Sequence, residues 1–301
     1  MKPKMFLPVL IVLISAGVRA QEPILFYDDS LKIGNGSLPG MAVIIPEVEY
    51  QETLDNWVKT LQSGTKSTVV TENGEMTIFG ANIKEIAPDP INVYSRFSAS
   101  DTGLCLAAAF ELRKDLYIEK TTGDADHERA KTFLFNFAKN QYIRLVEEQL
   151  KAEETILRDL EKEMSTLEKE GSGMEKTIRK SERTISSEAE KLTDMNNHLT
   201  SLTAAISEHS MALPSMSSGE ERDTKEDYLK GLEKDKKKTL KSITRSEKKK
   251  RKAERALAKA RSGIPKVNRN QDDIRKTIDE QAAVVEKYSG KLNQVKNFIV
   301  N

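Results

Sequence analysis

The chain is short of cysteine, histidine and aromatic residues. Its 301 residues include one cysteine and three histidines, and Phe, Trp and Tyr together make up 6%. A single cysteine excludes an intramolecular disulfide, and three scattered histidines leave no zinc-ligand pattern. Cys105 lies in the apolar run 104–110, so we expect a buried, unreactive thiol, with a reactive thiol as the alternative. We expect no metal and no cofactor.

Long apolar runs are also scarce, and the first of them sets the expected compartment. Residues 1–4 are basic, residues 5–17 are apolar, and Val18-Arg-Ala20 is typical of a cleavage site. The run is shorter than the ~20 residues that span a bilayer. We therefore expect a signal peptide over residues 1–20, with an uncleaved anchor as the alternative. The protein would be exported, to the periplasm or outer surface of a Gram-negative bacterium.

The aromatic residues concentrate in the first half, and only Tyr228, Tyr288 and Phe298 come after position 143. We therefore expect a packed core before that position only, in a domain over 41–145 that follows a flexible lead-in over 21–40. Strand signals occur at 41–45, 67–71, 75–79, 91–97 and 104–112. Apolar residues at helical spacing predict helices over 50–62 and from about 124 onward. The fold class is α+β, a small antiparallel sheet with one or two covering helices.

From position 146 the apolar residues repeat with a 3,4 spacing. Fifteen of 20 seam positions are apolar over 146–213, and 15 of 21 over 229–299. A heptad pattern of this length predicts a coiled coil, broken by turn residues and charge at a tip loop over 214–228. Because the two arms are nearly equal in length, we expect a long antiparallel coiled-coil hairpin within a monomer. A parallel dimer is the alternative.

Helix-breaking residues occur in both arms. Gly171 and Gly173 lie in the first arm, and Gly263 and Pro265 lie in the second. Aligning the two arms from the tip brings these groups close together. Within a helix, glycine costs ~1 kcal/mol and proline ~3 kcal/mol. We therefore predict a hinge at this level, with harmless sequence drift as the alternative.

The second arm carries a strongly basic stretch. Residues 234–261 contain fourteen Lys or Arg and three acidic residues, a net charge of +11, although the whole chain has a net charge of +1. The densest part is Lys248, Lys249, Lys250, Arg251 and Lys252. The simplest interpretation is a solvated helix face, and the functional alternative is a site for anionic lipid or an anionic polymer. Nucleic acid is not expected, since no aromatic residue is present for base stacking.

No catalytic constellation is recognisable in the sequence. It has no nucleophile elbow, no metal-binding helix signature and no Ser/His/Asp or Cys/His set. His209 falls on the seam, where a tolerated polar residue is the simplest interpretation and pH sensing the alternative. We expect that the protein is not an enzyme and name no catalytic residue. An enzyme in the α/β domain remains the third hypothesis.

Four short segments give the chain a family resemblance. They are Arg19-Ala-Gln21, Asn56-Trp-Val-Lys59, Pro90-Ile-Asn-Val-Tyr94 and Phe133-Leu-Phe-Asn-Phe-Ala138. With them, the layout resembles uncharacterised exported Bacteroidota proteins that have a small α/β domain followed by a coiled coil. The resemblance implies the layout of the whole chain and brings no activity and no site residues.

These features together favour a structural or interaction protein of the bacterial envelope. The coiled coil would be a rigid spacer, and the small domain would bind an unknown protein or envelope component. The second hypothesis is a surface-associating module whose basic arm, residues 234–261, binds anionic lipid or polymer.

Overall fold

The computed structural model of the protein describes residues 24–33, 36–121 and 123–299. The predicted signal peptide, residues 1–20, lies outside the described residues. The chain divides into two compact units, of which the first is Met1–Thr155 together with Ala283–Asn301 and the second is Ile156–Ala282. The first unit therefore takes in more of the chain than the predicted domain over 41–145, because residues from the far end of the sequence belong to it.

Seven strands of the first unit form one antiparallel sheet. They are β1 (Leu25–Ile33), β2 (Gly36–Pro46), β3 (Val70–Glu72), β4 (Glu75–Ala81), β5 (Ile91–Ser100), β6 (Gly103–Arg113) and β7 (Leu116–Tyr117). Their order is β1-β2-β6-β5-β4-β3, and β7 pairs with β6. The α+β class predicted from the sequence is confirmed.

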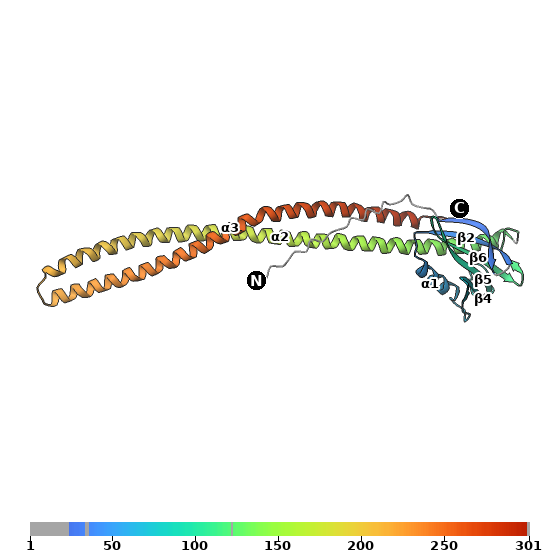
Figure 1. Ribbon diagram of the computed structural model, residues 1–301, viewed down its shortest axis with the longest axis horizontal. Coiled ribbons are helices and arrows are strands. Elements are labelled where there is room, and N and C mark those ends of the chain that lie inside the picture. Colours follow the sequence, from blue (N-terminus) through green and yellow to red (C-terminus); the bar gives the residue numbers. More distant parts are fainter. Residues whose placement is uncertain (1–23, 34–35, 122, 300–301) are drawn as a thin grey trace. The chain divides into compact units, whose positions relative to one another are not determined.

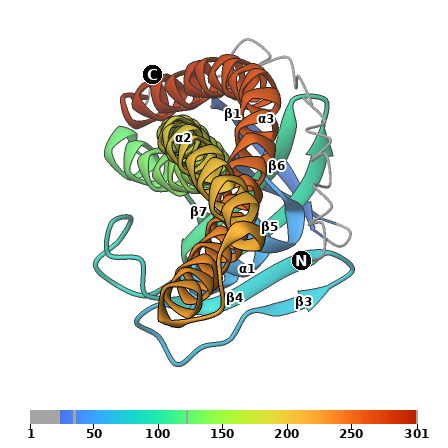
Figure 2. The ribbon, with the colours of Figure 1, turned by 90° about the vertical axis from the view of Figure 1, so that its left-hand side faces the viewer.

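Glycine has a specific role in two hairpins of the sheet. Asn73 and Gly74 join β3 to β4 with φ angles of 51° and 79°, which a tight two-residue turn requires. These strands are the cyan pair in Figure 2. In the second hairpin, β5–β6, strand β6 begins at Gly103. A Cβ at this position would lie 2.3 Å from the Ile45 carbonyl oxygen of β2. Only glycine fits where β6 passes so close to β2.

The predicted flexible lead-in over residues 21–40 is wrong for the part that the structure describes. Residues 25–33 form β1, and β2 already begins at Gly36. The two strands pair from Leu25 opposite Ile44 to Ile33 opposite Gly36. Consecutive acidic residues at 28 and 29 mask the strand pattern in the sequence, because charged residues are rare in strands. Main-chain pairing with β2 outweighs this low propensity.

One face of the sheet packs against α1 (Tyr50–Leu61) and the beginning of α2 (Asp124–Ala212). Trp57 of α1 is completely buried, and its ring centroid lies 4.8 Å from that of Phe137 and 5.9 Å from that of Phe133 on α2. The Trp57 indole N–H donates to Ser95 Oγ of β5 at 2.9 Å, so burial leaves this donor paired. The core thus lies between the sheet and the two helices.

The second unit is a hairpin of two helices, α2 and α3 (Glu220–Lys296), which run side by side (Figure 1). The predicted tip loop over 214–228 is too long. A short 3-10 turn, Leu213–Ser215, follows α2, and α3 begins at Glu220. Three acidic residues in the first turn of α3, Glu220, Glu221 and Asp223, favour an early helix start because they complement the helix dipole. No helix among the described residues is long and apolar enough to span a membrane.

The seam between the arms follows the predicted spacing. Leu160, Leu167 and Leu202 of α2 and Val267 of α3 are buried at seam positions. A Cβ at Gly171 would lie 3.5 Å from both Val267 Cγ1 and Gln271 Nε2, which confirms the predicted alignment of Gly171 with Gln271.

This alignment gives a test of the intrachain hairpin in solution. Ile206 and Lys236 lie thirty-five residues tipward of Gly171 and Gln271 respectively, which is five full heptads on each arm. In a Cys105→Ala background, Ile206→Cys with Lys236→Cys should therefore crosslink within one chain. Non-reducing electrophoresis measures this as a faster-migrating monomer.

The control pairs Ile206→Cys with Lys266→Cys, which the same alignment places roughly 45 Å apart along the hairpin. That pair should stay uncrosslinked within a chain. Crosslinks that form only between chains for the first pair would show that the arms associate as a parallel dimer.

Candidate functional site

A concave surface of the first unit runs along α2, between this helix, α1 and the segment 82–86. Two adjoining cavities of about 470 and 460 Å³ share Thr60, Glu85, Phe133 and Gln141. We call them together the α1–α2 groove. Its other lining residues are Asn56, Lys59, Ser63, Asn82, Ile83, Glu128, Arg129, Thr132, Asn136, Phe137, Asn140 and Arg144.

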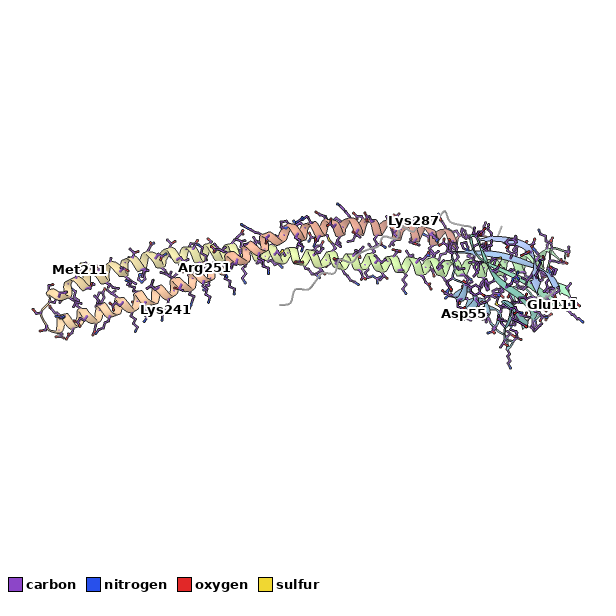
Figure 3. The ribbon with its side chains drawn as sticks, in the orientation of Figure 1. Asp55, Glu111, Met211, Lys241, Arg251 and Lys287 are labelled. Atoms are coloured by element: carbon purple, nitrogen blue, oxygen red, sulfur yellow. The ribbon has the colours of Figure 1, made fainter. Side chains whose placement is uncertain are left out.

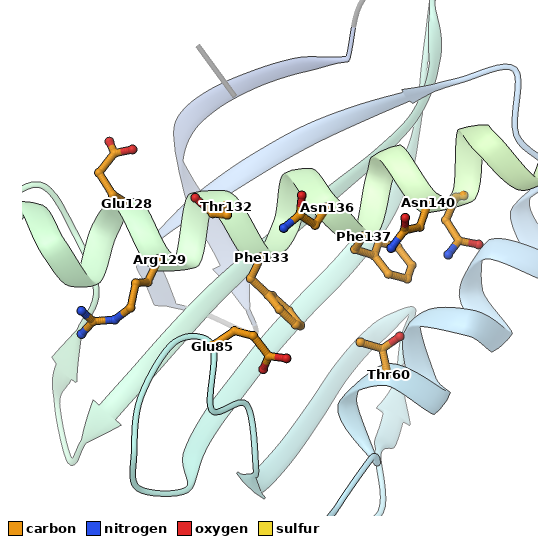
Figure 4. A pocket seen from close by; sticks show the side chains of 10 residues that line it. Thr60, Glu85, Glu128, Arg129, Thr132, Phe133, Asn136, Phe137 and Asn140 are labelled. Atoms are coloured by element: carbon orange, nitrogen blue, oxygen red, sulfur yellow. The ribbon is translucent and has the colours of Figure 1, made fainter. Parts of the chain in front are cut away.

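A row of polar side chains lies along α2 at the edge of the groove. Thr132, Asn136 and Asn140 are spaced four residues apart, so they share one face of the helix (Figure 4). All three are exposed. Within the described residues, their side chains make no hydrogen bond or ion pair. They are therefore available to a ligand.

The floor and far wall come from distant parts of the chain. Phe133 points from α2 toward Glu85, and Thr60 lies across the gap on α1 (Figure 4). Asn56 Nδ2 of α1 donates to Gln141 Oε1 of α2 at 2.8 Å and ties the two walls together. The sheet positions α1 against α2 through Trp57, so the shape of the groove depends on the core beneath it.

The charged groups of the groove fall into two sets. Arg129 is already occupied, since its Nε donates to the Ile86 carbonyl at 2.8 Å and its guanidinium contacts Asp126. Arg144 pairs with Glu52 at 3.3 Å. Glu85 and Lys59 have no ion-pair partner among the described residues. The groove is therefore close to neutral and rich in amide and hydroxyl groups.

The opposite face of the sheet carries a satisfied polar cluster. Glu111 accepts hydrogen bonds from Asn92 Nδ2 at 2.8 Å, Tyr94 OH at 3.1 Å and the Asp115 N–H at 2.9 Å. Burial alone would raise the pKa of Glu111, but these bonds lower it below its ordinary value. Burial and the same carboxylate raise the pKa of Tyr94 to about 12. Glu111 is thus held ionised, which suits a structural acceptor and not a proton donor.

Two further groups of the first unit, His127 and Cys105, are paired or buried. His127 Nε2 lies 2.7 Å from Asp28 Oδ1, and Lys120 Nζ lies 3.1 Å from the other Asp28 oxygen. Cys105 is buried, as predicted, with Tyr27 OH 3.3 Å from its sulfur. In the part of the chain that the structure describes, no group of three or more His, Cys, Asp or Glu could hold a metal ion.

The predicted basic residues lie on α3 and face solvent to different degrees. Lys249 lies 3.8 Å from Glu188, Lys250 4.0 Å from Glu254 and Arg251 3.6 Å from Glu247. Lys248 and Lys252 are exposed and have no ion-pair partner among the described residues. Lys241 and Arg251 are labelled on α3 in Figure 3. The Lys250–Glu254 and Arg251–Glu247 pairs are surface pairs, so most of the positive charge remains accessible.

Glu188 is a polar residue buried in the seam beside this basic stretch. Its carboxylate accepts from Ser246 Oγ across the hairpin and from Lys191 Nζ at 3.0 Å, and only 7% of its side chain is exposed. The hydrogen bonds from Ser246 and then Lys191 lower the pKa of Glu188 below its ordinary value. A buried polar pair of this kind disfavours shifted alignments, since any shift would leave the carboxylate without its partner.

The predicted hinge residues meet across the hairpin without interrupting either helix. α2 is continuous through Gly171 and Gly173, and α3 is continuous through Gly263 and Pro265. A Cβ at Gly263 would lie 2.9 Å from Met174 Sδ and Cε, whereas one at Gly173 would meet nothing within 4 Å. An apolar-walled cavity of about 540 Å³ lies beside this level. The hinge itself stays a prediction.

Comparison with models of known protein families gives no match, and comparison with curated proteins gives none either.

Sequence analysis did not anticipate the α1–α2 groove. The helix expected from about 124 onward is assigned only the role of covering the sheet. The available signal was the unbroken series Thr132, Asn136 and Asn140. Charged residues at the same spacing, Glu128 and Arg144, flank this series, so it is a short uncharged stretch of one exposed helix face.

The hinge can be tested by its effect on distances along α2. In a Cys105→Ala background, spin labels at Glu161→Cys and Ser187→Cys flank the glycines and lie ~39 Å apart in a straight helix. Gly171→Ala, Gly173→Ala and Pro265→Ala together should narrow the distance distribution. Each glycine change adds ~1 kcal/mol of helix stability, and Pro265→Ala restores a backbone donor.

The matched control is Gly231→Ala, another helix-interior glycine with open space around its Cβ position. It should add similar helix stability and leave the distribution between the labels unchanged. A wild-type distribution that is already as narrow as that of the triple variant would mean that the four residues form no hinge.

Proposed function

We propose that this chain is an exported structural or interaction protein of the bacterial envelope. In this proposal the helical hairpin is a rigid spacer, and the α+β domain is the part that binds a partner. The observation that carries it is the contrast between the two units. The hairpin has a seam of buried apolar residues, whereas the domain presents the exposed polar row of the α1–α2 groove.

Several features support a binding role over a catalytic one. The polar row of the groove, Thr132, Asn136 and Asn140, consists of a hydroxyl and two amides, which hydrogen-bond well and are poor general acids or bases. The carboxylate with a lowered pKa on the other face of the sheet, Glu111, is fully occupied by hydrogen bonds. Recognition of a surface or chain segment therefore suits these side chains better than proton transfer.

The test is photo-crosslinking in the native cell envelope followed by mass spectrometry. A photoreactive amino acid replacing Asn136, in the groove, should capture one recurrent envelope component. The same amino acid replacing Glu148, an exposed residue further along α2, should capture that component far less. Equal capture at both positions, or none at either, would refute a partner-binding role for the groove.

The second candidate is association with anionic lipid or polymer through the basic arm, 234–261. The observation in its favour is that Lys248 and Lys252 are exposed without ion-pair partners in the described chain, while Arg251 is 68% exposed beside Glu247. Because exposed charges are screened by salt, binding of this kind should weaken strongly as ionic strength rises.

For this candidate, Lys248→Glu, Arg251→Glu and Lys252→Glu should leave the seam intact and weaken binding to phosphatidylglycerol vesicles. Each Lys or Arg near an anionic surface contributes about 1 kcal/mol, so the loss should be at least roughly 100-fold. Co-sedimentation at low salt measures it. Lys151→Glu, Lys169→Glu and Lys176→Glu on α2 change the net charge equally and should have little effect. Absence of wild-type binding at low salt would eliminate this candidate.

A further inference from the structure

The polar row on α2 has the repeat of an extended polypeptide. Residues four apart on a helix rise about 6.0 Å, and every second residue of an extended strand advances about 6.6 Å. Thr132, Asn136 and Asn140 therefore stay nearly in step with alternate residues of a chain laid along the helix. Each asparagine offers a donor and an acceptor, which matches the N–H and C=O of one main-chain residue.

The length of the groove limits the size of this segment. Its lining residues on α2 run from Glu128 to Arg144, a rise of roughly 24 Å. At about 3.3 Å per residue, an extended segment of some seven residues fills that length. If the N–H and C=O groups of the segment face the polar row, every second side chain points toward the floor of the groove, and the one over Phe133 meets its half-buried ring, so an apolar residue is favoured at that position.

The charged residues at the two ends of the groove suit a segment that carries both signs of charge better than a uniformly charged polymer. The cavity nearer the start of α2 is lined by Glu85, Glu128 and Arg129, and the adjoining one by Lys59, Glu85 and Arg144, so that with Glu85 shared the first has a small net negative charge and the second a small net positive charge. A uniformly acidic or basic polymer would meet like charge at one end. A segment with a basic residue at one end and an acidic residue at the other meets opposite charge at both.

The aromatic rings argue against an oligosaccharide, which the amides alone would also suit. Trp57 is fully buried and Phe137 is 6% exposed, so neither presents a ring face to the groove. Phe133 already makes ring contacts with Trp57 and with Phe110, whose centroid is 6.3 Å away. No open aromatic platform is therefore present among these residues.

We infer that the α1–α2 groove binds an extended polypeptide segment of about seven residues. Its main chain hydrogen-bonds to Asn136 and Asn140, and one apolar side chain of the segment packs on the accessible part of Phe133. This inference rests on the proposed function in placing the partner on the α+β domain, and it names the chemistry of that partner.

The test begins with selection of a phage-displayed random heptapeptide library on the full-length protein. Selected sequences should share an apolar residue at one position, and the corresponding synthetic peptides should bind in fluorescence polarisation. Asn136→Ala with Asn140→Ala should weaken their Kd by roughly 30-fold, as expected for the loss of two or more hydrogen bonds. Asn196→Ala with Asn197→Ala, two exposed asparagines further along α2, is the matched control and should leave Kd unchanged.

N-methylated peptides add a readout that a merely structural role of the asparagines would not produce. In an extended peptide, the odd-numbered and even-numbered N–H groups point to opposite sides. Methylation of the set that faces the polar row should abolish binding, and methylation of the other set should preserve it.

Failure to select any heptapeptide, or equal binding by the Asn136→Ala/Asn140→Ala variant, would overturn the inference. Binding of cellohexaose that depends on these asparagines would overturn it in favour of a glycan site. If peptides fail but Asn136 still captures an envelope component, the proposed function survives without this inference.

Discussion

The contact on which the first unit depends joins residues 244 positions apart. Lys291, near the end of α3, places its ammonium 2.9 and 2.8 Å from the two carboxylate oxygens of Glu47, which follows β2. Lys291 also lies 5.3 Å from the ring centre of Tyr142, whose hydroxyl is 3.2 Å from Glu47. Only 11% of the Lys291 side chain is exposed. A charge-assisted hydrogen bond of this kind contributes on the order of 2 kcal/mol.

The apolar neighbours of Lys291 extend the same attachment. Val295 is completely buried in the domain core, and Leu292 and Phe298 pack against it. Lys139 Nζ adds a hydrogen bond to the Phe298 carbonyl at 2.8 Å. The hairpin is therefore an insertion between two parts of one domain and not an appendage after a finished one. Lys291 can reach Glu47 only if the two arms stay aligned. The Glu188–Ser246 pair, which disfavours shifted alignments, therefore also favours the Lys291–Glu47 contact.

The sequence predicts the elements that have a periodic apolar pattern or a characteristic turn. The 3,4 spacing predicts which face of each arm is buried, and Asn73-Gly74 predicts a hairpin because both residues need positive φ. The sequence does not predict β1, because main-chain pairing with β2 stabilises a strand whose own side chains are acidic at 28 and 29. Nor does it predict the α1–α2 groove, since Asn56 and Gln141 become neighbours only through packing of Trp57 beneath them. Surfaces built by distant segments leave little periodic trace in a sequence.

The return of α3 into the domain core also determines the order in which the molecule can be completed. As the chain emerges during synthesis, the strands and α1 appear first, yet the core position of Val295 remains empty until the second arm has been made. The hairpin therefore has to close before the domain is finished. A chain that stops short of residue 291 leaves Glu47 and Tyr142 without their cation and exposes apolar surface on the domain. Incomplete copies would thus differ physically from complete ones, in a form that proteolytic quality control can recognise.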